Sequence, residues 1–393
     1  MGDLIRFLIE FLLYGNKDAI QRVGYEEDES QWHLYDVVIV PCGHLGKRLV
    51  MPDLTPPRPE RVGKTLVVRT DIVYNTFFFI SRAEEVLVSE RDEHDRFLAC
   101  HSILGKDSRL TTPLIDEYGR MLLEWLSLPQ PEQKLKTVFL THDVDSIARY
   151  RNFKGFLGSV RRGHLQRALA SLKNIRQDPD YTFPWLMKQD GKLTSKTVPV
   201  YTLYFAKDTL GYGMDYPQYH LDGYDFSTLA QQIMKSGAQI GWHSSYYRHF
   251  PKELNAAINY SLHRSHYLRC SLDWMEKISH QGVMQDYSMG FADQAGFRLQ
   301  TSRPVQWINP YTYEITSMVL HPLTVMDVTL SEPKYMGLNK DDAMVVCQQL
   351  IDKSEQMGGE VTLLWHNSNL GEETYHRSLY PALLQYIKEK IND

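Results

Sequence analysis

The sequence predicts an α/β protein in two parts, a small N-terminal α/β domain followed by a mostly parallel sheet with helices outside it. The chain of 393 residues is longer than one hydrophobic core usually supports, so two domains are expected. Residues 127–134 (SLPQPEQK) carry two prolines among polar residues, which favours a boundary there. From residue 135 onward, strand-like runs alternate with helical segments. We therefore expect an N-terminal accessory domain of unassigned role at 1–134 and a second domain at 135–393.

The N-terminal domain is expected to begin with a helix. Residues 1–24 start with an apolar run that Asp3, Arg6 and Glu10 interrupt, and no small-residue cleavage site follows it. This pattern predicts an amphipathic helix rather than a signal peptide. Runs of β-branched and aromatic residues predict strands at 36–41, 65–69 and 71–80, and apolar residues at helical spacing predict a helix at 116–126.

The second domain is expected to carry polar side chains at the ends of its strands. The predicted strands are 137–145, 198–206, 239–245, 282–288, 324–330 and 360–368, and the predicted helices include 227–236, 251–257 and 341–357. Several of these strands end in the motifs HDVD, HSS, DYS and WHNS. Active sites of parallel sheets and barrels gather at the carboxyl ends of the strands. Residues 153–181 are basic and helical in pattern, which indicates a solvated helix or an insertion over the site.

Composition excludes some classes of function. The net charge of −5 offers no large positive field for a phosphate backbone, so nucleic acid is not an expected partner. No run of 18 apolar residues exists, so no membrane span is expected. The four cysteines are scattered, which fits a reducing compartment and, without a signal peptide, a cytoplasmic location. Nothing in the sequence indicates an oligomeric state.

Asp143 and Asp145 are the first candidate functional pair. Because side chains alternate along a strand, both can point the same way. Converging carboxylates repel unless a cation or a shared proton resolves the repulsion, and a divalent metal ion is one solution. The alternative is that Asp145 only caps a following helix.

Further candidates follow other predicted strands. His243 is either a metal ligand at a strand end or a structural histidine, and His249 is either a second ligand or an exposed residue. His366, at the end of another buried run, is suited to general-acid catalysis. Arg264 is expected to orient one of the aspartates or to form an interhelical salt bridge. Asp286 and Arg298 either line the site or serve packing and turns.

These motifs resemble a known family. The order of THDVD, WHSSY, RSHYLR, DYSMGFAD with GFR, and LLWHNS is similar to that of the NodB-type polysaccharide deacetylases, carbohydrate esterase family 4. The likeness is greatest to the divergent branch that has an HDVD first motif and often a further N-terminal domain, and it covers residues 135–370. It implies a distorted (β/α) barrel and metal-assisted hydrolysis of an N- or O-acetyl group on a sugar. The implied cofactor is a divalent metal ion, zinc first, with nickel, cobalt or manganese as alternatives.

The resemblance also implies roles for individual residues. Asp143 matches the general base, Asp145 the metal-binding carboxylate and His243 the first metal-binding histidine. Arg264 matches the arginine that orients the base, and His366 matches the general acid.

The sequence departs from the family pattern at three places. Val144 separates the two aspartates, which the family usually has side by side. Tyr247 stands where the family has its second metal-binding histidine. Either His249 or a water molecule replaces that ligand, or the site holds its metal weakly. His266 stands where the family has a proline, and it could itself join the site.

The expected activity is removal of an acetyl group from an amino sugar or acetylated glycan in surface-polysaccharide metabolism, with a carbohydrate as the partner. The residues expected to contact that substrate are Trp242, Tyr247, His266, Asp286, Arg298 and Trp365. One alternative is a catalytically impaired carbohydrate-binding protein on the same scaffold. Another is a glycosidase that pairs Asp143 with Asp286 or Asp327.

Overall fold

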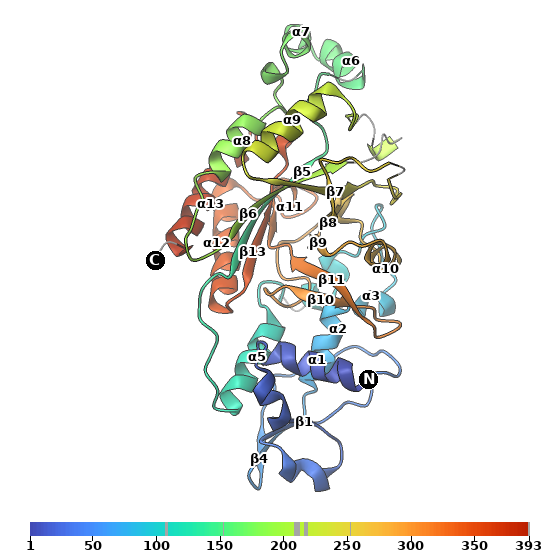
Figure 1. Cartoon of the computed structure of the whole chain (residues 1–393), viewed down its shortest axis with the longest axis vertical. Coiled ribbons are helices and arrows are strands. Elements are labelled where there is room, and N and C mark those ends of the chain that lie inside the picture. The colour runs from blue at the N-terminus through green and yellow to red at the C-terminus, as the bar shows by residue number, and fades with distance from the viewer. Residues whose placement is uncertain (107–108, 152, 208–212, 216–218, 252, 392–393) are drawn as a thin grey trace.

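The protein is built around two sheets of unequal size (Figure 1). The computed structural model describes residues 1–393 except 107–108, 152, 208–212, 216–218, 252 and 392–393. The smaller sheet has four strands in the order β1-β2-β4-β3, and the larger has nine in the order β10-β11-β9-β8-β7-β6-β5-β13-β12. The small sheet lies at one end of the molecule, and helices α6 and α7 lie at the other.

The N-terminal region forms the small sheet and the helices beside it. Its helices are α1 (Gly2–Leu12), α2 (Ile72–Ile80), α3 (Glu84–Leu87), α4 (Ile103–Lys106) and α5 (Leu114–Trp125), with the short 3-10 helices η1 (Lys17–Arg22), η2 (Glu29–Leu34) and η3 (Ala99–His101). Its strands are β1 (Val23–Tyr25), β2 (Val37–Ile39), β3 (Glu60–Val62) and β4 (Thr65–Val68). The amphipathic first helix is confirmed, because Leu4, Leu8 and Leu12 are buried on one side of α1.

The strand predicted at 71–80 is wrong, because these residues form helix α2. The Asp71 side chain accepts a hydrogen bond from the Tyr74 backbone N–H at 2.8 Å, which caps the helix. Every residue of α2 is buried, so no polar face marks the helical period. A continuous apolar run of this length reads equally well as a buried strand.

The large sheet is mostly parallel, as predicted. Its strands are β5 (Thr137–Val144), β6 (Val200–Lys207), β7 (Gln239–Ser244), β8 (Asn259–Ser265), β9 (Gln285–Met289), β10 (Val305–Ile308), β11 (Ile315–Pro322), β12 (Val325–Met326) and β13 (Glu360–Leu364). Every neighbouring pair is parallel except β10 with β11. The segments between the strands form α6 (Phe153–Arg161), α7 (Leu165–Lys173), η4 (Ile175–Gln177), α8 (Phe183–Asp190), η5 (Gly213–Asp215), α9 (Tyr224–Lys235), η6 (His266–Leu268), α10 (Leu272–His280), α11 (Asp327–Ser331) and α12 (Lys340–Gln356). After the last strand, β13, come η7 (Asn367–Asn369) and α13 (His376–Ile391).

The large sheet is curled into a half-barrel. Five buried side chains from four of its strands form a separate cluster, Phe139, Leu203, Phe205, Leu262 and Tyr287. His321 of β11 approaches Glu360 of β13 at 2.8 Å, which joins strands that are not neighbours in the ladder. Among the described residues, the hydrogen-bonded ladder ends at β10 and β12. The α/β class is therefore confirmed, whereas the closed barrel that the resemblance implies is not shown.

Two other predicted elements differ from the structure. Residues 324–330 are a strand only at Val325–Met326, after which Asp327 begins helix α11. Residues 251–257 form no helix in their described part, and Lys252 lies outside it. Asn255 makes a turn there instead, because its side chain accepts a hydrogen bond from the Ala257 N–H at 2.9 Å.

Buried ion pairs attach the N-terminal region to the large sheet. Glu85 of α3 contacts Arg298 at 2.6 Å, and Asp116 of α5 contacts Arg303 at 2.8 Å. Among the described helices, none is long and apolar enough to cross a membrane.

Candidate metal and catalytic site

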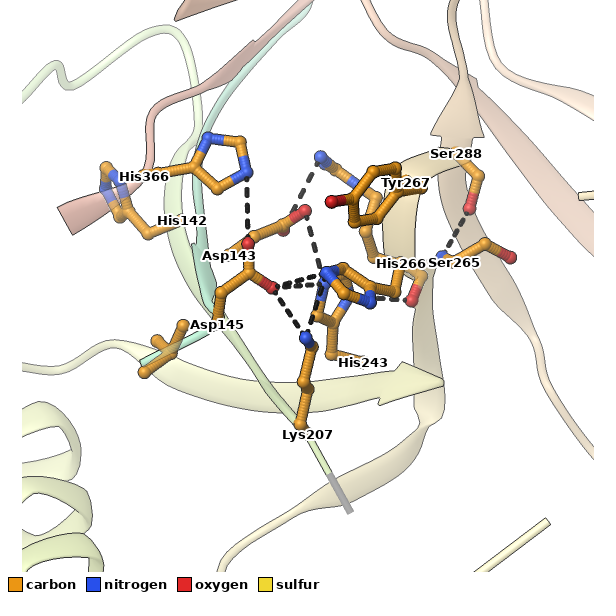
Figure 2. Close-up of polar contacts among 12 residues, drawn as sticks. His142, Asp143, Asp145, Lys207, His243, Ser265, His266, Tyr267, Ser288 and His366 are labelled. Atoms are coloured by element: carbon orange, nitrogen blue, oxygen red, sulfur yellow. Dashed lines mark hydrogen bonds and ion pairs between the residues drawn. The ribbon is translucent and has the colours of Figure 1, made fainter. Parts of the chain in front are cut away.

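Two carboxylates meet at the carboxyl end of β5 (Figure 2). Asp143 lies within the strand and is almost fully buried, whereas Asp145 follows the last strand residue, Val144, and its side chain is 32% exposed. Because they are two residues apart on an extended chain, both carboxylates point toward the same group of histidines.

His243, on β7, joins these carboxylates. Its Nε2 lies 3.6 Å from Asp143 Oδ2 and 3.3 Å from Asp145 Oδ1. Its Nδ1 lies 2.9 Å from the Arg264 carbonyl oxygen, which can only accept a hydrogen bond, so Nδ1 carries the hydrogen and Nε2 presents its lone pair. Burial lowers the pKa of His243 despite the nearby aspartates, which favours the neutral ring that a metal ligand must have.

His266 completes the group from the first position of η6. Its Nε2 lies 3.1 Å from Asp145 Oδ1, and its Nδ1 lies 3.0 Å from Asp215 Oδ1. Asp215 also accepts the Tyr246 backbone N–H at 3.0 Å, so its position is fixed. One possible ligand atom each from Asp145, His243 and His266 lies within 4.8 Å of the other two.

This donor set fits a divalent metal ion. Asp145 Oδ1 and His243 Nε2 are buried and have no partner in hydrogen-bond geometry, an arrangement that costs free energy unless a cation satisfies both atoms. Two imidazoles and a carboxylate match the ligand preferences of zinc and related ions. The second ring nitrogen of each histidine is held by a carbonyl or a carboxylate, as is usual around metal-binding histidines.

The ammonium group of Lys207 lies beside the same possible metal ligands. This buried residue ends β6, and its Nζ lies 2.9 Å from His266 Nε2, 3.2 Å from Asp145 Oδ1 and 3.6 Å from Asp215 Oδ1. Burial alone would raise the pKa of Asp145, but Lys207, His266 and His243 together hold that pKa well below its usual range. The predicted strand stopped at residue 206, so this residue was missed, although a charge directly after a buried run was the available signal.

Arg264 lies next to Asp143, as the resemblance implied. The buried guanidinium donates to Thr141 Oγ1 at 2.8 Å, and its Nη1 is 3.7 Å from Asp143 Oδ1. Its plane lies over the Phe205 ring, with a distance of 5.1 Å between the guanidinium carbon and the ring centre. The arginine therefore approaches Asp143 on the oxygen that does not face His243.

His366 follows β13 and faces the carboxylates from the opposite side. Its Nε2 is 3.7 Å from Asp145 Oδ2, and its Nδ1 is 2.8 Å from Asp327 Oδ1. Burial alone would lower its pKa, but Asp327, Asp145 and Asp143 outweigh that effect and raise the pKa of His366 to about 10. These carboxylates therefore favour the protonated ring, which suits His366 to donate a proton.

These groups open into a cavity of about 360 Å³, within the size range of small-ligand sites. Asp143, Asp145, His266 and His366 are among the residues that line it. Tyrosine, charged and apolar side chains complete the lining, among them Tyr267, Tyr335, Arg96, Glu332, Lys334 and Met326. A larger cavity of about 670 Å³ shares Ser368 with the first but has none of the clustered acids and histidines in its wall.

The N-terminal region contributes to the wall of this cavity. Arg96 pairs with Asp92 at 2.7 Å, donates to Tyr335 Oη at 2.8 Å and reaches the Tyr267 carbonyl at 3.3 Å. Tyr267 and Leu268, which directly follow His266, both have left-handed backbone angles, with φ of 59° and 55°. Such angles are costly for residues other than glycine and persist only where neighbouring contacts impose them. Residues 92–96 supply some of those contacts.

Several residues expected at the site lie elsewhere. His249 is exposed and outside the metal-binding group, with its backbone N–H directed to Ser245 Oγ, and Tyr247 is exposed and does not line the cavity. The remaining residues expected to contact substrate are buried away from the cavity lining: Trp242, Asp286, Arg298 and Trp365. Of that expected set, only His266 lines the cavity. Asp215 and Lys207 were not anticipated, and Asp327 was considered only as a glycosidase carboxylate.

A second polar cluster has the Ser–His–Asp contacts of a nucleophile triad, but substrate cannot reach it. His263 Nε2 lies 2.9 Å from Ser244 Oγ, and its Nδ1 lies 2.6 Å from Asp286 Oδ2. All three residues are fully buried, and none lines the cavity. Asp286 also accepts the Ser288 N–H at 2.9 Å, so the cluster satisfies buried polar groups between β7, β8 and β9. This arrangement supports neither serine chemistry nor a glycosidase pair that includes Asp286.

Residues 21–131 match the model of a family of unknown function, DUF7033. No curated protein matches the chain. A crystal structure from Mycobacterium smegmatis, of a protein provisionally assigned as a polysaccharide deacetylase, superposes with a TM-score of 0.43 and 12% sequence identity, covering 66% of this chain and 86% of that one. A superposition this loose supports no conclusion about function.

Proposed function

We propose that the protein is a metal-dependent hydrolase that removes an acetyl group from an amino sugar or acetylated glycan. The observation that supports this most directly is the convergence of Asp145, His243 and His266. His243 lies 3.6 Å from Asp143, His366 lies 3.7 Å from Asp145, and all of these residues except His243 line one cavity. Asp145, His243 and His266 would hold the ion, with His266 in the role first expected for His249. When bound, the ion would polarise the acetyl carbonyl and a water molecule.

Asp143 would act as the general base. It lines the cavity, where its carboxylate can accept a proton from the attacking water. Arg264 lies 3.7 Å from one of its oxygens, and His243 lies 3.6 Å from the other. These contacts restrict the orientation of the carboxylate, which general-base catalysis requires.

His366 would act as the general acid. Its Nε2 lies on the cavity side, opposite the nitrogen that Asp327 holds at 2.8 Å. Protonation of the leaving amine or alkoxide by Nε2 would break the C–N or C–O bond without release of a strongly basic anion. Asp327 fixes the ring and favours its protonated form, so Asp327 is a positioning residue.

The wall of the cavity suits a sugar. Tyr267 and Tyr335 offer apolar surface, while Arg96, Glu332 and Lys334 offer polar groups for hydroxyls. A role in surface-polysaccharide metabolism is proposed from the motif resemblance alone and goes beyond this chemistry.

The test is acetate release by the purified chain. The protein is stripped with chelator, reloaded with zinc, cobalt, nickel or manganese, and incubated with chitin oligosaccharides and with acetylated xylan. We expect metal-dependent acetate release that Asp143→Asn reduces by about 10²-fold or more while the bound metal stays, since general-base catalysis supplies factors of that size. Release of reducing ends instead of acetate would indicate a glycosidase and refute the proposal.

Lys207 favours a second candidate, a carbohydrate-binding protein without catalysis. Its ammonium already lies within 3.2 Å of two of the three possible ligands, so the chain can neutralise Asp145 without a metal ion. This function predicts sugar binding by calorimetry that is equal with and without zinc, and no zinc bound even at millimolar concentrations. A bound, stoichiometric metal ion would exclude it.

A further inference from the structure

Helices α6 and α7 expose an apolar stripe each. On α6 the stripe is Phe153, Leu157 and Val160, with exposures of 75%, 40% and 42%, and on α7 it is Leu165, Leu169 and Leu172, with 43%, 52% and 48%. Within each helix these residues are spaced i, i+4 and i+7, so they lie on one face. None of the six packs into the hydrophobic clusters of the described core.

Basic residues surround these stripes. Residues 146–177 contain eight lysines and arginines and no aspartate or glutamate, in a chain whose net charge is −5. Arg161, Arg162, Lys173 and Arg176 are exposed and form no ion pair with any carboxylate among the described residues. The exposed apolar and unpaired basic side chains thus share one short segment.

The pair of helices projects from the end of the molecule opposite the small sheet (Figure 1). It is fixed at its base, because Arg151 pairs with Asp225 at 3.0 Å and Ser171 Oγ donates to Asp178 at 2.6 Å. The small or buried side chains Ser159, Ala168 and Ser171 face inward, which leaves the larger apolar ones outside. The orientation of the two helices therefore exposes the apolar stripes. No neighbouring element among the described residues covers them.

We propose that the α6–α7 hairpin, residues 153–173, binds the surface of a bilayer that contains anionic lipids. Short amphipathic helices with an apolar face and basic flanks lie in the interface between headgroups and acyl chains. The stripes would enter that interface, and Arg161, Arg162 and Lys173 would face the anionic headgroups. Both helices have nine residues, so they lie on the membrane rather than cross it.

Charge favours a bilayer over a second copy of the chain. Two hairpins packed face to face would bring together two sets of arginines that have no carboxylate partner among the described residues. Like charges in an apolar contact are repulsive. An anionic surface complements the same charges. This inference is independent of the proposed function, because it uses none of the residues of the candidate site.

The experiment is sedimentation of the full chain with two kinds of vesicle, phosphatidylcholine alone and phosphatidylcholine with an equal part of phosphatidylglycerol. We expect binding only to the second kind, weakened by salt. The double variant Arg161→Glu with Arg162→Glu should lower the partition coefficient at least about 25-fold, because each basic residue contributes about a fivefold factor. The triple variant of Leu165, Leu169 and Leu172 to Ser should lower it at least about tenfold.

The control is a matched charge reversal far from the hairpin. Arg58→Glu with Lys64→Glu changes the net charge equally at two exposed positions of the N-terminal region and should bind the vesicles like the wild type. Equal losses in the control and in the hairpin variant would mean that net charge alone decides binding, which overturns the proposal. The proposal would also be overturned if the wild type did not bind anionic vesicles. The same holds if analytical ultracentrifugation showed a dimer that the leucine variant loses.

Discussion

Replacing Glu85 by Gln tests how the N-terminal region is attached to the large sheet. Glu85 lies 2.6 Å from Arg82 Nη2 and 2.6 Å from Arg298 Nη2, and all three side chains are at most 5% exposed. Arg82 also donates to the Cys270 carbonyl, so this network connects α3 to the chain after β8. The substitution keeps the shape of the side chain but leaves two buried guanidinium groups without their carboxylate.

The expected loss of stability is large. Burial alone would raise the pKa of Glu85, but Arg298 and Arg82 outweigh it and lower the pKa from 4.5 to about 2. A lowering of this size corresponds to about 3 kcal/mol of folding free energy. Removing one partner of a buried ion pair costs about 3–5 kcal/mol, so Glu85→Gln should lower the free energy of unfolding by about that amount.

The sign of the pH dependence follows from the lowered pKa. In the wild type this contribution is fully present above about pH 4.5, the unfolded value, and is lost as the pH falls toward 2. The Glu85→Gln variant should therefore not show this part of the loss of folding stability at acidic pH.

Urea unfolding followed by tryptophan fluorescence at several pH values measures both effects. The control is Glu90→Gln, a nearby exposed glutamate, which should change stability by at most about 0.5 kcal/mol. If Glu85→Gln is as stable as this control at pH 7, the buried network does not hold the two parts together.

Three further predictions concern the candidate site. Lys207→Met should raise the zinc affinity by at least about tenfold in calorimetry. The substitution removes the repulsion between the ammonium and the ion, and a repulsion of about 1.4 kcal/mol already corresponds to a tenfold change in affinity. An unchanged affinity would mean that Lys207 does not compete with the ion. Arg96→Met should raise KM for the acetylated substrate more than it lowers kcat, because the substitution removes the contacts that hold Tyr267 and Tyr335 but leaves the proposed catalytic groups unchanged. A KM equal to that of the wild type would contradict this. Asp327→Asn should move the alkaline limb of the rate profile to lower pH, because it removes the carboxylate that raises the pKa of His366, and an unmoved limb would exclude His366 as the acid.

Much of the large sheet could be predicted because its strands are short apolar runs that end in polar residues. Asp143, His243 and His366 all lie at the carboxyl ends of parallel strands, which the order of the elements places at one edge. Arg264 lies near the end of β8, a strand that was not predicted, and its position beside Asp143 came from motif order rather than periodicity.

The third possible ligand could not be chosen from spacing along the chain. His249 is close to His243 in sequence, but the chain turns outward after β7 and leaves it exposed. His266 is 23 positions away from His243, yet the pairing of β7 with β8 places His243 beside Arg264, and so near His266. Sheet register, which motifs do not encode, decides between them.

Hydrophobic periodicity also did not predict the correct element where all residues of a segment are buried. Helix α2 is buried on all sides, so its sequence lacks the alternation that separates a helix from a strand. Asp327 belongs to a run that reads as a strand, and its partnership with His366 depends on α11 beginning at that residue.

Metal content of four purified proteins tests the central claim most directly. The wild type, His243→Ala, His266→Ala and His249→Ala are prepared without chelator, dialysed against zinc and measured by mass spectrometry of the metal. If Asp145, His243 and His266 form the site, the wild type and His249→Ala hold one zinc per chain, and the other two lose it. Zinc retained by His266→Ala but lost by His249→Ala would contradict this assignment.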